Sequence, residues 1–168
     1  MLDEEGKARV REILGDLLTN EKVLSMKNYI QHGNVTTYDH ALNVAYLCYE
    51  WCGNLPHPVN ERVLLRAAML HDFFLYDWHV HDKRHRLHGF RHARFAAENA
   101  VRYLSVSEEE RRLIESHMWP LNPAKMPLTR EGWILTCVDK YVSLRETFLC
   151  RRTPASRGRR KREKQGVS

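Results

Sequence analysis

Apolar residues recur at intervals of three and four along nearly the whole chain, the spacing of helices that bury one face. In segment 4–30 they fall at Val10, Ile13, Leu14, Leu17 and Leu18, and again at Val23, Leu24 and Ile30. The polar pair Thr19-Asn20 predicts a break in this helical segment. No stretch shows the apolar–polar alternation of a β-strand, so the pattern predicts an all-α fold.

Turn and capping residues mark where the next helices begin and end. Gly33-Asn34 predicts a turn, and Thr36 or Thr37 can cap the helix that follows it to about residue 52. A third helix is expected from about residue 59 to the pair His71-Asp72. The irregular, basic stretch 77–87 then precedes a fourth helix over about 89–104.

Two more helices complete the predicted bundle. Ser107 and Glu110 have the spacing of a capping box, which opens a short helix that ends by His117. Three prolines prevent a regular helix until Thr129, which can cap the last one. That helix carries Asp139. The sequence therefore predicts a single compact helical domain over residues 1–150.

The charge of the chain is concentrated at one end. The formal net charge is +6, but residues 151–168 hold eight Lys or Arg and a single acid, so residues 1–150 are near neutral. The tail has no apolar periodicity and is predicted to be disordered. Such a tail could contact a polyanion, but a solvated end is the more common role, and we do not expect nucleic-acid binding.

Four scattered cysteines form neither a disulfide framework nor a zinc-finger spacing. No apolar run reaches the ~20 residues that span a bilayer, and the first residues do not resemble a secretory signal. We therefore expect a cytoplasmic protein that does not enter a membrane.

The candidate chemistry starts from the pair His71-Asp72, which ends the apolar helix Ala67-Ala-Met-Leu. An imidazole and a carboxylate at the edge of a core are costly to bury unless something satisfies them. A divalent cation would do so, and mixed His/Asp donors suit Fe, Mn, Co, Ni or Zn better than Ca.

With His40 upstream and Asp139 downstream, this pair resembles the ordered pattern of the HD-domain superfamily of metal-dependent phosphohydrolases. The matching stretches are Tyr38-Asp-His-Ala-Leu, Ala67-Ala-Met-Leu-His-Asp and Thr136-Cys-Val-Asp-Lys. The resemblance covers about residues 30–150. It implies an HD-like helical fold and a metal site that consists of His40, His71, Asp72 and Asp139.

The resemblance also implies a second ion. Relatives with two ions carry further histidines between the doublet and the final Asp, and His88 and His117 match them, with Asp72 as the bridging ligand. His92 stands where the family has a glycine and is expected to be a neighbour of the site. A single ion on the four core residues is the alternative.

An HD-type phosphohydrolase would use a metal-activated water on a phosphomonoester or a phosphodiester, a nucleotide among the candidates. Asp72, Asp77 and Lys140 are the candidate catalytic residues, and Lys83, Arg84 and Arg91 are the candidate phosphate-binding residues. Many relatives have Lys or Glu three residues after the doublet, where this chain has Leu75. The acid that protonates the leaving group therefore stays unassigned.

Two other readings use the same ligands. Some similar proteins hold two irons and activate dioxygen to oxidise a C–H bond. A non-catalytic module could instead use the ions as a structural staple or a sensor. The sequence leaves the substrate, the physiological metal and the oligomeric state open.

Overall fold

The computed structural model describes residues 2–79 and 88–152, with side chains to residue 148. Its helices are α1 (Glu4–Leu14), α2 (Asp16–Thr19), α3 (Glu21–Leu24), the 3-10 turn η1 (Ser25–Asn28), α4 (Thr37–Cys52), α5 (Glu61–Leu70), α6 (His88–Tyr103), α7 (Glu108–Ser116) and α8 (Arg130–Arg152). A small hairpin, β1 (Ile30–His32) and β2 (Val35–Thr36), is the one sheet among the described residues. The predicted all-α bundle is confirmed.

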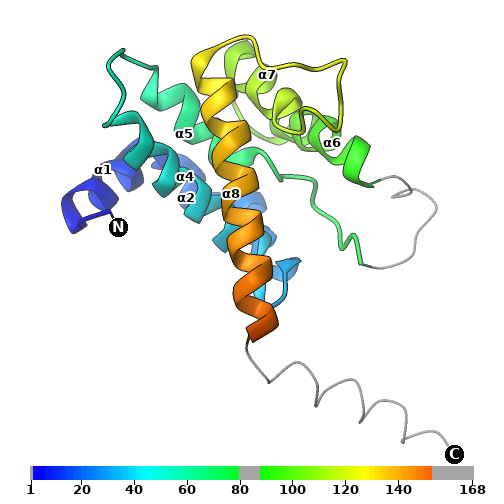
Figure 1. Cartoon of the computed structure of the whole chain (residues 1–168). Coiled ribbons are helices and arrows are strands. Elements are labelled where there is room, and N and C mark those ends of the chain that lie inside the picture. Colours follow the sequence, from blue (N-terminus) through cyan, green and yellow to red (C-terminus); the bar gives the residue numbers. More distant parts are fainter. Residues whose placement is uncertain (1, 80–87, 153–168) are drawn as a thin grey trace, which may run out of the picture.

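The bundle is organised around α4 and α5, which pack against each other along their lengths. Helix α8 packs on both of them and on α7, while α1 covers α4 and α5 from the other end. Figure 1 shows α8 crossing the molecule, with α1 on one side and the α6–α7 pair on the other. Side chains from every layer fill the core, among them Leu14, Val44, Leu65, Ile114 and Leu135.

The predicted break at Thr19-Asn20 is confirmed, since α2 ends at Thr19 and Asn20 caps α3. The first helical segment also has an earlier break that was not predicted. Helix α1 ends at Gly15, whose φ of 28° lies in a region that side chains disfavour, and α2 begins at the next residue. The apolar spacing continues across this break because Leu14 and Leu17 both face the core. The apolar spacing of the sequence therefore gave no sign that the chain changes direction at Gly15.

The hairpin corrects the expectation that the chain has no strands. Ile30 pairs with Thr36 and His32 with Val35, around a turn that contains Gly33. Strands of three and two residues are too short to show alternation in the sequence. The hairpin brings Gln31 and His32 to the same end of the bundle as the first turn of α4.

The predicted caps are confirmed. The Thr36 side chain accepts a hydrogen bond from the amide of Asp39, at the start of α4. Ser107 and Glu110 form the complete capping box of α7. The Thr129 hydroxyl accepts from the amide of Gly132 at the start of α8. These caps fix where the helices that carry the candidate ligands begin.

A buried ion pair ties α5 to α7. Arg66 is 3% exposed, and its Nε donates to Glu110 Oε1 at 2.8 Å. Its Nη1 reaches Asp16 Oδ1 at 2.6 Å, and Nη2 reaches the carbonyl of Ser105 at 3.4 Å. Since Glu110 is also buried, the two charges depend on each other.

Helix α8 continues through Arg152, two residues into the predicted tail, and residues 153–168 lie outside the described part of the chain. Among the described helices, none combines the length and the apolar character needed to cross a bilayer.

Candidate metal centre

Four side chains that are far apart in sequence meet at the centre of the bundle. His40 lies in the first turn of α4, and Asp139 lies in the middle of α8. His71 caps the C-terminus of α5, and Asp72 follows it. Asp139 Oδ1 is 3.2 Å from His40 Nε2 and 3.4 Å from His71 Nε2. Asp72 Oδ2 is 3.3 Å from His71 Nε2 and 3.9 Å from His40 Nε2. All four side chains are buried.

Two further imidazoles join this group from the other side. His117 follows the last turn of α7, and His92 lies one turn into α6. Their Nε2 atoms are 3.1 Å apart. Asp72 Oδ1 lies 3.4 Å from His92 Nε2 and 3.9 Å from His117 Nε2. The six residues are hereafter called the central cluster.

Backbone carbonyls fix the orientation of three of the four imidazoles. The Nδ1 atoms of His71, His92 and His117 donate to the carbonyls of Ala68, His88 and Ile114, at 2.7, 3.0 and 2.7 Å. A carbonyl can only accept, so each Nδ1 carries a proton. In the neutral ring, the lone pair is then on Nε2, which points into the central cluster.

A carboxylate orients the fourth imidazole. His40 Nδ1 donates to Glu146 Oε2 at 2.8 Å, and Asn43 Nδ2 donates to Glu146 Oε1 at 3.2 Å. Glu146 lies two turns after Asp139 on α8 and is buried. Both residues therefore face His40 from one side of the same helix.

The acids of the central cluster are held by other polar groups as well. Gln31 Nε2 donates to Asp72 Oδ2 at 2.5 Å, and the Thr37 hydroxyl donates to the Gln31 side-chain oxygen at 3.4 Å. The Ser143 hydroxyl donates to Asp139 Oδ1 at 3.3 Å. These contacts restrict the rotation of both carboxylates.

Burial acts to lower the pKa of both His40 and His117, but the hydrogen bonds around the two imidazoles differ. Burial alone would lower the pKa of His40, but hydrogen bonds to Asp139 and Glu146 raise it to about 9. Burial lowers the pKa of His117 to about 3, and the neighbouring imidazole of His71 acts in the same direction. Burial would likewise lower the pKa of His71, but Asp72 and Asp139 raise it well above its usual value. Without an ion, His40 and His71 thus hold protons and His117 stays neutral.

Two buried polar atoms of the central cluster, His71 Nε2 and Asp72 Oδ1, have no hydrogen-bond partner among the described residues. A buried polar atom without a partner costs about 1–3 kcal/mol. Both atoms point toward the other donors, and three sets of three donors lie within 4.8 Å of one another: His40–His71–Asp72, His71–His117–Asp139 and Asp72–His92–His117. Four imidazoles and two carboxylates in this arrangement fit divalent transition metals.

The structure does not bring His88 into these donor sets and brings His92 instead. His88 Nδ1 lies 2.9 Å from the Tyr76 hydroxyl, and its ring stacks on that of His92 at a centroid distance of 4.7 Å. His88 and His92 are one helical turn apart and share a face of α6. His92 reaches the central cluster, and His88 lines the space beside it.

A cavity of about 610 Å³ opens beside the central cluster. Four cluster residues face it, namely Asp72, His92, His117 and Asp139. The rest of its described lining is mixed polar and apolar: Gln31, His32, Trp78, His88, Gly89, Met118, Lys140, Ser143 and Leu144. A small molecule in this cavity would meet the His92–His117 side of the cluster first.

The other predicted residues lie in different settings. Lys140 lines the cavity, and its Nζ donates to the carbonyl of His117 at 2.9 Å. Asp77 lies in an exposed turn, where its carboxylate accepts from the amide of His79 at 2.9 Å. The Arg91 guanidinium lies over the Phe95 ring at 5.0 Å and is not among the described residues that line the cavity. The predicted phosphate ligands Lys83 and Arg84 lie outside the described residues.

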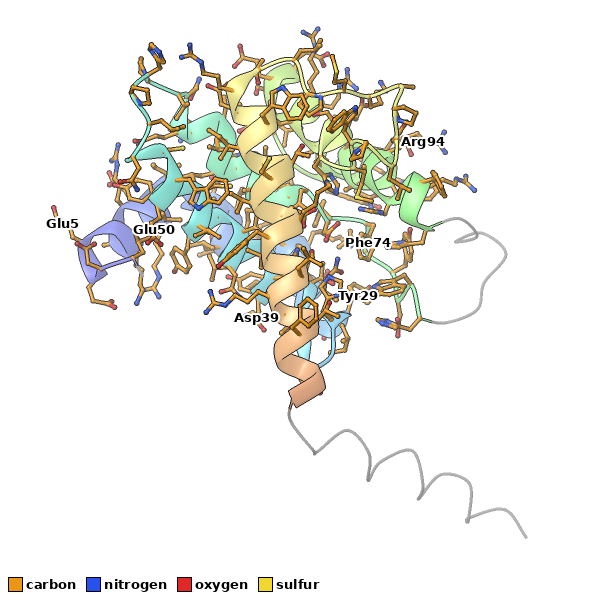
Figure 2. All side chains as sticks on the ribbon, viewed as in Figure 1. Glu5, Tyr29, Asp39, Glu50, Phe74 and Arg94 are labelled. Carbon is orange, nitrogen blue, oxygen red and sulfur yellow. The ribbon has the colours of Figure 1, made fainter. Side chains whose placement is uncertain are left out.

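The segment after the doublet is held firmly. Asn99 of α6 donates to the carbonyls of Phe73 and Phe74 at 3.0 and 3.2 Å, and Leu75 then turns the chain with a φ of 58°. Figure 2 shows Phe74 on the α6 side of α8, across that helix from Glu50. The turn at Leu75 thus stands at the position where many relatives have a charged residue, and Trp78, three residues later, lines the cavity.

The roles of Glu146 and Gln31 and the place of His92 within the central cluster were not anticipated from the sequence. For Glu146 a signal existed, because an acid seven residues after Asp139 falls on the same buried helix face. For Gln31 there was none, since its contact with Asp72 depends on the hairpin.

Comparisons with curated proteins and with solved structures gave no significant match. A family comparison did give one, to the HD domain, over residues 37–144. That range includes all six residues of the central cluster and about two thirds of the chain. The chain belongs to the HD domain family.

Proposed function

We propose that the protein is a metal-dependent phosphohydrolase that binds two divalent ions at the central cluster. His40, His71 and Asp139 would hold one ion, His92 and His117 the other, and Asp72 would bridge them. Candidate ions are Fe, Mn, Co, Ni and Zn, since borderline nitrogen donors are mixed with carboxylates. Membership of a family rich in such hydrolases supports the proposal.

The arrangement of Asp72 is the observation that carries the proposal. Its Oδ2 faces His40 and His71, whereas its Oδ1 faces His92 and His117. Oδ1 is buried, and no described residue donates a hydrogen bond to it. A carboxylate with one oxygen toward each pair of imidazoles has the geometry of a bridging ligand, and a hydrogen-bonded structural aspartate needs no such symmetry.

The charge of the centre supports two ions and an anionic substrate. Three buried carboxylates lie here, those of Asp72, Asp139 and Glu146. One divalent ion would leave the centre negative, which disfavours a phosphate ester. Two ions would leave it positive, which suits a phosphate group.

The two positions differ in access. His92 and His117 line the cavity, while His40 and His71 are not among its lining residues. The bridged pair of ions would supply an activated water and would stabilise charge on the phosphoryl oxygens. The ion held by His92 and His117 would have fewer protein donors and would face the substrate, as in metal sites that keep an open position.

Residues of the cavity wall would bind and orient the substrate. Lys140 places its ammonium group at the wall, fixed by the His117 carbonyl, where it can contact a phosphate oxygen. His32 and His88 also line the cavity and could carry the proton that the leaving group needs. Asp77, in its exposed turn, is less well placed for that role.

The organic part of the substrate would lie against Trp78 and Leu144. The Trp78 ring already contacts two imidazoles, those of His79 at 3.9 Å and His88 at 5.2 Å between ring centroids. A phosphomonoester or phosphodiester would contact the part of the ring that faces the cavity, and a nucleotide is one candidate.

The test is metal-dependent hydrolysis by the purified chain. Metal-free protein supplied with Mn²⁺ or Co²⁺ is expected to hydrolyse p-nitrophenyl phosphate or its bis ester, and Asp72→Asn is expected to lose that activity. Glu98→Gln, which removes a surface carboxylate paired with Arg94, is the matched control and should keep it. Activity that requires iron and consumes dioxygen would instead support the oxygenase reading.

A further inference from the structure

His40 differs from the other three imidazoles of the central cluster in what holds its outer nitrogen. His71, His92 and His117 each donate Nδ1–H to a backbone carbonyl. His40 donates to the carboxylate of Glu146 at 2.8 Å. A charged acceptor binds this proton more strongly than a carbonyl does and makes the opposite nitrogen a better donor to a cation.

The contact is built into the core. His40 is fully buried, and Glu146 is 8% exposed. The second oxygen of Glu146 accepts from Asn43, one turn after His40 on α4. A buried carboxylate with both oxygens bonded has little freedom to rotate, so it fixes both the tautomer and the plane of the His40 ring.

The contact also makes the two ion positions unequal. The position of His40, His71 and Asp139 has a further negative charge behind it, from Glu146. Among the described residues, His92 and His117 have no carboxylate on Nδ1, and they share only Asp72. The His40–His71–Asp139 position therefore has more ligands and more negative charge around it than the position of His92 and His117.

We propose that Glu146 is a positioning residue that acts through His40 and makes the His40–His71–Asp139 position the tighter of the two. This inference rests on the proposed metal centre, but not on the reaction catalysed there. The protein would load this position first, and the ion beside His92 and His117 would bind more weakly and exchange more readily.

Glu146 is also open to substitution without change to the catalytic cavity. With Asn43 it lines a different cavity of about 860 Å³, together with Tyr46, Tyr141 and Arg145. None of these residues lines the cavity beside the central cluster. An effect of Glu146 on ion affinity can thus be separated from an effect on substrate contact.

The experiment is a Co²⁺ titration of the metal-free full chain, followed by calorimetry and visible absorption. The His92→Ala background removes a ligand of the second ion position and keeps the His40–His71–Asp139 position. In this background, Glu146→Gln is expected to weaken Co²⁺ binding by roughly 10- to 100-fold, the usual effect of losing a partner of a metal-bound histidine. In a His40→Ala background, the same substitution should change Co²⁺ affinity by less than about threefold, because its effect passes through His40.

Glu50→Gln is the matched control for the loss of charge. Glu50 lies on α4, ten residues and about 15 Å along the helix from His40. The Glu50→Gln substitution should leave Co²⁺ affinity unchanged in both backgrounds. Asn43→Ala, which removes the second support of Glu146, provides a milder variant and is expected to weaken the same position.

Equal losses in the two backgrounds would overturn the proposal, because they would show that Glu146 acts by general charge or through the fold. Unchanged affinity in the His92→Ala background would overturn it as well. Since the titration measures binding without turnover, a chain that binds Co²⁺ but hydrolyses no phosphoester would refute the proposed reaction alone.

Discussion

His92 on α6 and His117 just after α7 point their Nε2 atoms at each other across 3.1 Å. Each ring donates its Nδ1 proton to a backbone carbonyl, so two neutral rings would bring two lone pairs together. The low pKa of His117, lowered by burial to about 3, keeps that ring neutral. This arrangement is unfavourable on its own and becomes favourable when a cation accepts both lone pairs.

One consequence concerns the stability of the metal-free protein. In His92→Gln, a side-chain amide can donate to His117 Nε2, so the metal-free variant should melt at the same temperature as the wild type or higher. The same variant should lose most of the increase in melting temperature that Mn²⁺ or Co²⁺ produces, because binding stabilises only the form that holds the ion. Thermal unfolding with and without the ion measures both effects. A variant less stable without metal, but equally stabilised by it, would contradict this account.

A second prediction concerns pH. Hydrogen bonds to Asp139 and Glu146 outweigh burial and raise the pKa of His40 to about 9, against about 6.5 in an unfolded chain. Between these values the folded, metal-free protein holds a proton that the unfolded chain has lost. The contribution of His40 to stability is therefore fully present below about pH 6.5 and is lost as the pH rises through about 9.

The comparison of wild type with His40→Gln isolates this contribution from other groups that titrate in the same range. The difference in melting temperature between the two metal-free proteins should be largest near pH 6 and should shrink toward pH 9. A difference that grows with pH would mean that His40 is neutral in the folded protein and would refute the assignment.

A third prediction concerns the joint between the helices that carry His71 and His117. Arg66→Ala leaves Glu110 as a buried charge without its main partner, which should cost about 3–5 kcal/mol of unfolding free energy. Arg112→Ala removes an exposed arginine that pairs with Glu108 and should cost about 0.5 kcal/mol or less. Urea unfolding of the two variants tests this difference. Similar losses of unfolding free energy would show that the Arg66–Glu110 ion pair does not hold α5 and α7 together.

The helical order of the chain could be predicted because each helix has its own apolar stripe and cap. His40, the doublet and Asp139 could be placed on separate helices for the same reason. Their convergence, however, depends on how α4, α5 and α8 pack, and periodicity does not give that. The hairpin and the break at Gly15 were missed because both are shorter than the window over which a period can be recognised.

The choice between His88 and His92 shows a different limit. Residues four apart share a helix face, so the sequence identifies the face but not which turn reaches the centre. His88 was preferred because it matched a family stretch. In the structure, α6 packs on α7, and His92 lies on the buried face of α6 with its Nε2 atom 3.1 Å from that of His117.

The contacts that orient the ligands were the least visible in the sequence. Glu146 reads as one more acid on an amphipathic helix until α4 is placed beside it. Gln31 reads as a loop residue until the hairpin folds against Asp72. Each of these contacts joins residues more than 40 positions apart, and only the tertiary structure brings them together.

The number of ions bound per chain tests the central claim most directly. Elemental analysis of protein loaded with Mn²⁺ or Co²⁺ should give two ions per chain for the wild type and for His88→Ala, and one for His92→Ala. Two ions in His92→Ala with one in His88→Ala would assign the second position to His88. No bound ion in the wild type would contradict the metal centre itself.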